Sequence, residues 1–131
     1  MRFLAIAAAT LALAACGSDE PTPSSPGNSD LADLTVTVDR DGNGSAPAKT
    51  LNLTCNAPTD SDACGATAGI SAADLAPTPK DKACTQVFGG PETATIKGSI
   101  RGDDVDASFS RKNGCEIERW AKVEPLLSHV Q

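Results

Sequence analysis

The chain has 131 residues, which is enough for one modest domain. It has 11 Lys and Arg residues and 17 Asp and Glu residues, so the formal net charge is -6 and no basic stripe is available to bind nucleic acid. The single His, His129, lies close to the C-terminus, and no pair of nucleophile and base is visible, so we expect no enzyme.

Residues 1–15 have the pattern of an export signal. Arg2 precedes an apolar run from Phe3 to Ala14, which is too short to span a bilayer, since a span takes roughly 20 residues. The run ends in Leu13-Ala14-Ala15-Cys16-Gly17, which resembles the lipobox of bacterial lipoproteins. That resemblance implies cleavage before Cys16 and a lipid on its sulfur, which would anchor the chain to the outer face of the cell membrane. The alternative is ordinary secretion after cleavage near Ala14 or Ala15.

Residues 16–30 are predicted to form a flexible tether that begins with the lipidated Cys16. From Gly17 to Asp30 the chain is rich in Pro, Ser and acidic residues and has no aliphatic residue. Such a segment cannot bury enough apolar surface to offset the entropy lost on ordering. The folded domain is therefore expected to span residues 31–131.

Four segments of this domain alternate apolar and polar side chains. A period of two predicts strands of an antiparallel sheet with one face toward solvent. Turns are expected at residues 41–44 and 101–104, where Gly, Asn and Asp favour tight hairpins. The predicted inward positions are Leu34, Val36 and Val38; Leu51, Leu53 and Cys55; Ala94, Ile96, Gly98 and Ile100; and Val105, Ala107 and Phe109.

The first of these turns contains an Asp39-x-Asp41-x-Asn43-Gly44 motif, which matches the opening half of an EF-hand loop. The twelfth position is Thr50 rather than Glu, and Pro47 lies inside the loop. A polar turn is the simpler interpretation, with a weak calcium site at Asp39–Asn43 as the alternative.

Two short helices are predicted. Ser71-Ala72-Ala73-Asp74 has the pattern of a capping box, and Pro77 would end this helix within about two turns. A second helix is expected from about Cys115 to Val123, because Asn113 or the residue after it can cap the start and Pro125 follows. A sheet backed by two helices is an α+β sandwich of two layers.

Four cysteines remain for the folded domain once Cys16 is set aside. Export would place them in an oxidising compartment, so we expect two disulfides. Four cysteines allow three pairings, and the sequence alone does not choose among them. No two are spaced as C-x-x-C, so neither a metal nor another cofactor is expected. The cysteines are Cys55, Cys64, Cys84 and Cys115.

Several segments of the domain share the pattern of one known family. They are Leu34-Thr35-Val36-Thr37-Val38, Leu51-x-Leu53-Thr54-Cys55, Cys84-Thr85-x-x-Phe88-Gly89-Gly90-Pro91, and Phe109-Ser110 with Asn113-Gly114-Cys115-Glu116. Through these motifs and the order of its cysteines, the region from residue 31 to about 124 resembles the Streptomyces subtilisin inhibitor family.

This resemblance implies a five-stranded antiparallel sheet with two helices and a homodimer packed through its sheets. It implies the disulfide pairs Cys55–Cys64 and Cys84–Cys115. It further implies inhibition of extracellular subtilisin-like serine proteases. From the charge we expect no nucleic-acid partner, and from the lipobox we expect contact with the membrane only through the lipid. The alternative is a membrane-tethered binding protein that keeps the fold without inhibition.

The resemblance also implies which residues meet the protease. The reactive bond would be Gln86–Val87, with Gln86 as the P1 residue and Asn113 as the support behind the loop. Burying the Gln86 amide costs about 1–3 kcal/mol unless it finds partners, so weaker binding to subtilisin is expected than with an apolar P1 residue. The remaining contacts would come from Ala83, Cys84 and Thr85 at P4 to P2 and from Val87 and Phe88 at P1′ and P2′.

Overall fold

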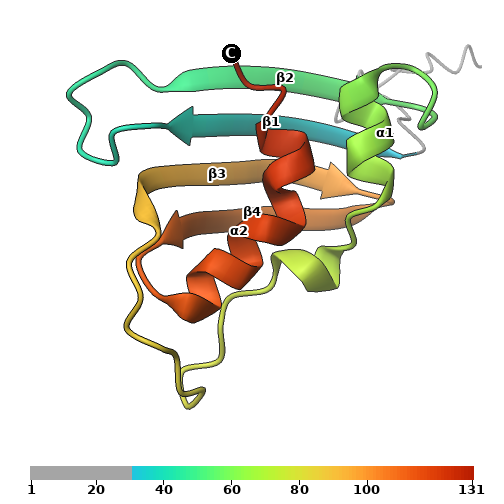
Figure 1. The fold of residues 1–131 in the computed structure, drawn as a ribbon. Helices are drawn as coiled ribbons and strands as arrows, with labels where there is room; N and C mark the ends of the chain where they lie inside the picture. The colour runs from blue at the N-terminus through green and yellow to red at the C-terminus, as the bar shows by residue number, and fades with distance from the viewer. Residues whose placement is uncertain (1–30) are drawn as a thin grey trace, which may run out of the picture.

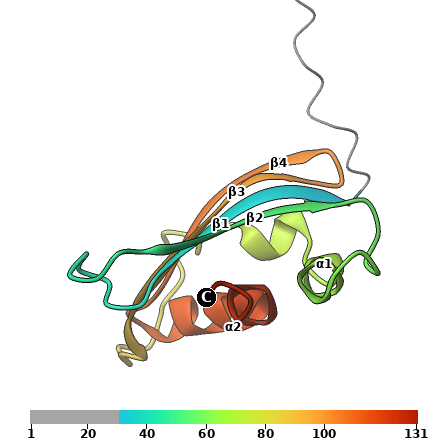
Figure 2. The same ribbon diagram turned by 90° about the horizontal axis from the view of Figure 1, so that it is seen from above.

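The computed structural model describes residues 31–131. The predicted signal peptide at residues 1–15, the lipidation at Cys16 and the tether at residues 16–30 lie outside this range. Within it, two layers face each other: a curved sheet and a layer of helices that covers one of its faces (Figures 1 and 2). No helix in this part of the chain has the length and apolar character that a membrane crossing requires.

The sheet is antiparallel and has four strands in the order β2-β1-β3-β4. The fifth strand implied by the resemblance is absent from residues 31–131, so that expectation is wrong. Ahead of β3 the chain follows the sheet edge with one main-chain hydrogen bond, from Gly89 N to Arg111 O at 2.7 Å, which is too little pairing to form a strand. The strands are β1 at Ala32–Asp39, β2 at Lys49–Cys55, β3 at Gly90–Ile100 and β4 at Asp103–Arg111.

The period-two alternation predicts most inward positions of the sheet correctly. It is wrong at Gly98 of β3, which is exposed and has no side chain to bury, and Leu51 of β2 is only half-buried. The inward positions of β1 are buried, while the side chain of Thr35 on the other face is exposed. On this open face, Thr35 donates to Asn52 at 3.2 Å and Thr37 and Thr50 share a hydrogen bond of 3.1 Å. The uncovered side of the sheet is therefore polar and hydrogen-bonded across its strands.

Both predicted turns are present. The β3–β4 hairpin turns on Arg101 and Gly102, which have φ values of 49° and 83°, the left-handed backbone that a two-residue turn requires. In the β1–β2 loop the Asp39 carboxylate accepts N–H groups from Asp41 and Gly42, each at 3.0 Å, and a third from residue 44. Asp39 thus organises a polar turn, and residues 31–131 assemble no group of three His, Cys, Asp or Glu side chains that could hold a metal.

The capping box forms at η1, a short 3₁₀ helix at Ala72–Leu75. Ser71 Oγ accepts from Asp74 N at 3.3 Å, and Asp74 Oδ2 accepts from Ser71 N at 3.0 Å. The Ser71 hydroxyl, and after it the Ser71 N–H, lower the pKa of the Asp74 carboxyl below its ordinary value. A further helix, α1 at Asp62–Ala68, is not predicted from the sequence, and Ser61 caps it by accepting from the N–H of its third residue.

Helix α2 spans Gly114–Leu127 and is longer than predicted. The expectation that it ends before Pro125 is wrong, because Pro125 lies inside its last turn. Proline has a helical φ and removes only one hydrogen bond there. Burial of Leu126 and Leu127 beyond it stabilises the extra turn, since both side chains are at most 4% exposed.

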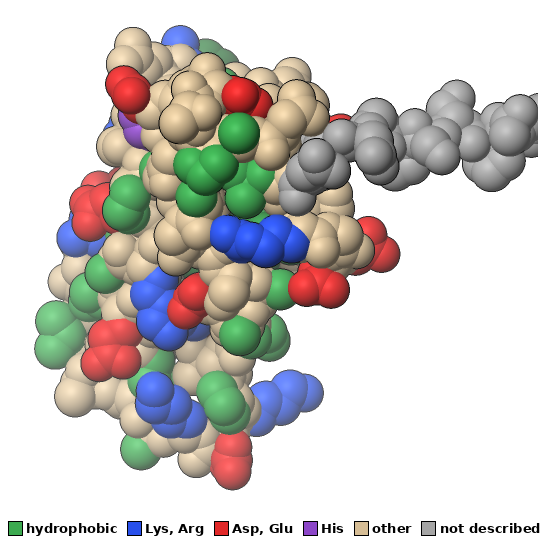
Figure 3. Space-filling view, turned by 90° about the vertical axis from the view of Figure 1, so that its right-hand side faces the viewer, with side chains coloured by type: hydrophobic (Ala, Val, Ile, Leu, Met, Phe, Trp, Pro, Cys, Tyr) green, Lys and Arg blue, Asp and Glu red, His purple; other side chains and the backbone are tan. Residues whose placement is uncertain are grey.

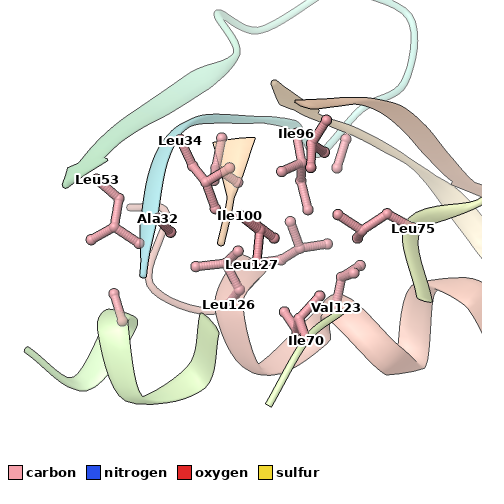
Figure 4. Packing of buried hydrophobic residues seen from close by; sticks show 14 of the residues in the cluster. Ala32, Leu34, Leu53, Ile70, Leu75, Ile96, Ile100, Val123, Leu126 and Leu127 are labelled. Carbon is pink, nitrogen blue, oxygen red and sulfur yellow. The ribbon is translucent and has the colours of Figure 1, made fainter. Parts of the chain in front are cut away.

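The core lies between the sheet and the helices. Figure 4 shows side chains of the strands, among them Leu34, Ile96 and Ile100, meeting Val123 and Leu126 of α2. The disulfide Cys55–Cys64 belongs to this core and joins β2 to α1. The other disulfide, Cys84–Cys115, lies at the edge of the core. Residues 31–131 thus contain the expected two disulfides with the expected pairing.

The molecule has two distinct ends along its strands. Leu31 leads into β1 beside the β3–β4 turn, where its carbonyl accepts from Arg101 N at 2.8 Å. On the face shown in Figure 3, hydrophobic side chains occur in small groups separated by polar and charged ones. At the other end of the sheet from Leu31, Asp39 of β1 pairs with Thr93 of β3. The segment ahead of β3 joins the sheet at this same end.

Candidate functional site

The candidate site is the segment between η1 and β3, the yellow connection that leads into β3 in Figure 1. Residues 81–88 are exposed except for half-buried Cys84. Val87 is 56% exposed and Phe88 is 70% exposed, and they are the two large hydrophobic side chains that residues 31–131 leave exposed. The structure thus brings the predicted loop residues, from Ala83 to Phe88, together on one open segment.

The first half of this loop is fixed to the start of α2. The disulfide Cys84–Cys115 joins it to the first turn of the helix. Gly114 N donates to Thr85 O at 2.9 Å. A Cβ at residue 114 would overlap Thr85 Oγ1, so any larger residue there would require the Thr85 side chain to rotate away. The chain is therefore held covalently at residue 84 and through its main chain at residue 85.

The second half is fixed to β4. Gly89 N donates to Arg111 O at 2.7 Å, and the Arg111 guanidinium pairs with Glu92 Oε1 at 3.2 Å. A Cβ at Gly89 would lie 2.8 Å from Cγ1 of Ile117, so the backbone rests directly on that side chain. Gly90 has a φ of 148° and lies against the Glu92 carboxylate. Arg111 thus holds the loop through its main-chain carbonyl and the start of β3 through its side chain.

A third contact fixes the segment further upstream. Thr78 Oγ1 donates to Glu116 Oε1 at 2.9 Å, and Arg119 pairs with the other oxygen of Glu116 at 2.8 Å. Arg119 also donates to the carbonyls of Leu75 at 3.2 Å and Ala76 at 2.9 Å. The Arg119 and Glu116 side chains are only 11% and 12% exposed, so this pair is shielded from solvent. Sequence reasoning missed it; the one available signal was the i, i+3 spacing of a Glu and an Arg on the predicted helix.

Asn113, predicted to support the loop, immediately precedes Gly114, and its side-chain hydrogen bond is made within its own helix. Its Oδ1 accepts from Glu116 N at 3.0 Å and caps α2. Among the hydrogen bonds of the described residues, the one that reaches the loop from this corner comes from the N–H of Gly114. Asn113 therefore acts on the loop by fixing where the helix begins.

These contacts leave a short unsupported bridge. Thr85 and Gly89 are both held by main-chain hydrogen bonds, and residues 86–88 between them make no main-chain hydrogen bond to the rest of the described chain. The Gln86 side chain turns back, and its Nε2 donates to Cys84 O at 3.2 Å. The site is thus an exposed tripeptide whose two ends are held firmly in place.

Comparisons with known proteins add no relative. No family model matches the sequence, and no curated protein or solved structure matches the chain. The function of the loop is therefore argued from its residues and geometry.

Proposed function

We propose that the chain is a serine-type endopeptidase inhibitor, which binds subtilisin-like serine proteases through this loop in the manner of a substrate. The reactive bond is Gln86–Val87. The observation that carries the proposal is the exposed bridge of residues 86–88 between two fixed ends. The resemblance in the sequence places the reactive bond in the same three residues.

A loop of this kind suits the binding cleft of a protease. An extended peptide adds to the edge strands of the protease by main-chain hydrogen bonds, while its side chains fill pockets. Residues 83–88 present their side chains outward for such contacts, apart from half-buried Cys84. Because the disulfide and the two main-chain bonds already hold the flanks, little conformational entropy is lost on binding.

The same supports explain how cleavage fails to release the protease. Hydrolysis of Gln86–Val87 adds one water and leaves a carboxylate on Gln86 and an amine on Val87. The new carboxylate lies one residue from Thr85, and the new amine lies two residues from Gly89, which are the two held positions. Both ends therefore stay close together, and re-formation of the bond competes with dissociation.

The test is a titration of active-site-calibrated subtilisin with the signal-less chain carrying Cys16→Ser. We expect stoichiometric loss of protease activity and slow cleavage confined to Gln86–Val87. Gln86→Pro should abolish inhibition, while Lys49→Ala, a control in β2, should inhibit like the parent. Full protease activity beside an intact domain would contradict inhibition and favour the alternative, a tethered binding protein that keeps the fold. Rapid digestion of the domain would contradict the rigidity of the loop.

Two further parts of the proposal concern location and assembly. We propose that the chain is exported and anchored by a lipid on Cys16, so palmitate labelling is expected in the parent and should be lost in Cys16→Ser. The homodimer implied by the resemblance stays a prediction, and sedimentation equilibrium of the soluble form tests it.

A further inference from the structure

We infer that Phe88 supplies more of the binding energy than Gln86, and that the target protease carries an apolar pocket for the P2′ residue. This inference rests on the proposed function and names the partner's chemistry. In an ordinary substrate-like inhibitor the P1 side chain would dominate. Here the exposed apolar surface lies on the other side of the reactive bond.

The exposure of Phe88 has no explanation within the domain. Its side chain is 70% exposed, whereas Phe109 is 2% and Trp120 8% exposed. Val87 beside it is 56% exposed, so both apolar residues that follow the proposed reactive bond are open to solvent. Single exposed apolar residues are common, but two adjacent ones on a braced loop mark a contact with a partner.

The residues after Phe88 leave it open to a partner. Gly89 and Gly90 have no side chains that could cover it. A Cβ at residue 89 would press on Ile117, and one at residue 90 would overlap the Glu92 carboxylate on a backbone whose φ of 148° favours glycine. Phe88 therefore projects from a backbone that is held one residue away, at the hydrogen bond of Gly89 N to Arg111 O. A fixed base lets an aromatic side chain enter a pocket with little loss of entropy.

Gln86 is poorly suited to supply most of the binding energy. Its Nε2 donates to Cys84 O at 3.2 Å in the free loop. In a substrate-like complex the P3 carbonyl, here that of Cys84, is an acceptor for the protease edge strand. Gln86 must give up this bond before its amide enters a pocket, where it needs new partners. Phe88 gives up no hydrogen bond on entering an apolar pocket.

The experiment compares inhibition constants for active-site-calibrated subtilisin among four proteins: the parent, Phe88→Ala, Phe88→Leu and Gln86→Ala. Phe88→Ala should weaken inhibition on the order of 30-fold, which corresponds to burial of one large apolar side chain. Phe88→Leu should stay within about 5-fold of the parent, and Gln86→Ala within about 3-fold. Phe88 and Gln86 are exposed, so thermal unfolding of all four should coincide and rule out a folding effect.

The outcomes separate this inference from the proposed function. Inhibition by the parent that weakens more in Gln86→Ala than in Phe88→Ala would overturn the inference and leave the proposed function in place. An equal small effect of both substitutions would also overturn it. If the parent does not inhibit, the proposed function fails, and the inference fails with it.

Discussion

Removal of each disulfide in turn separates stability from loop rigidity. The two perturbations are the double alanine variants of Cys84–Cys115 and of Cys55–Cys64. The first bond closes 31 residues of sequence and holds the loop, while the second closes 9 residues and lies in the core away from the loop. Both variants lose one covalent link, but only one of them frees the first half of the loop.

The expected losses of stability are similar. Loop-closure entropy gives about 3.7 kcal/mol for Cys84–Cys115 and about 2.6 kcal/mol for Cys55–Cys64. Cys55 and Cys64 are 0% and 1% exposed, so their replacement also removes buried packing. That packing is worth roughly 1–2 kcal/mol, which brings both variants to a loss of about 4 kcal/mol.

Urea unfolding measures the stability of both variants, and titration of active-site-calibrated subtilisin measures their function under conditions where both remain folded. We expect the Cys55–Cys64 variant to inhibit like the parent. The Cys84–Cys115 variant should be cut at Gln86–Val87 and consumed as a substrate, because the new carboxylate is then held only through the hydrogen bond of Gly114 N to Thr85 O and no longer covalently. Equal inhibition by the two variants would refute the reasoning that this bond provides the rigidity of the loop.

The remaining predictions concern the helix cap Asn113, the ion pair of Glu92 with Arg111, and the loss of stability at acid pH. Asn113→Ala should cost about 1 kcal/mol of unfolding free energy by urea titration and speed loop cleavage, while Asn113→Asp, which also caps helices, should cost little. Glu92→Gln weakens the partly exposed pair with Arg111 and should shift the equilibrium between intact and cleaved Gln86–Val87 about 2- to 5-fold toward cleavage, as quantified by chromatography. The pKa of Asp74 is lowered from 3.8, so the stability from this carboxylate is present above pH 3.8 and is lost as the pH falls through the lowered value. Asp74→Asn should flatten that loss, and urea midpoints between about pH 6 and pH 2 measure it.

The sheet was predictable from the sequence to a large extent. Alternation indicates which side chains of a strand face inward, and it predicted most buried positions of the four strands; it failed at Gly98, which is exposed because glycine has no side chain to bury. The fifth strand was expected from the resemblance, and no alternating segment required it. Helix α1 escaped prediction because its seven residues are too few to show a period of 3.6. Pro125 suggested a helix end because local rules do not register the burial of Leu126 and Leu127.

The loop itself was predictable, but most of its supports were not. The order of the cysteines and the Phe88-Gly89-Gly90 run located the exposed segment. The pair of Arg111 and Glu92 joins residues 19 apart, and Arg119 reaches a carbonyl 43 residues away. The first contact depends on how β3 pairs with β4, and the second on how α2 packs beside η1, and local sequence patterns encode neither. The one available signal was the i, i+3 spacing of Glu116 and Arg119 on the predicted helix.

The direction of β1 separates the start of the domain from the loop by the length of the sheet. The strand begins next to Leu31 and ends at Asp39, eight residues later, near the loop end of the sheet. At about 3.3 Å per residue, the strand is roughly 26 Å long. The chain enters the sheet after Leu31 at one end, and the segment that carries Phe88 joins the sheet at the other end. If the proposed lipid anchor at Cys16 holds the chain to a membrane, a bulky partner can approach the loop from the end of the domain that is farther from that membrane.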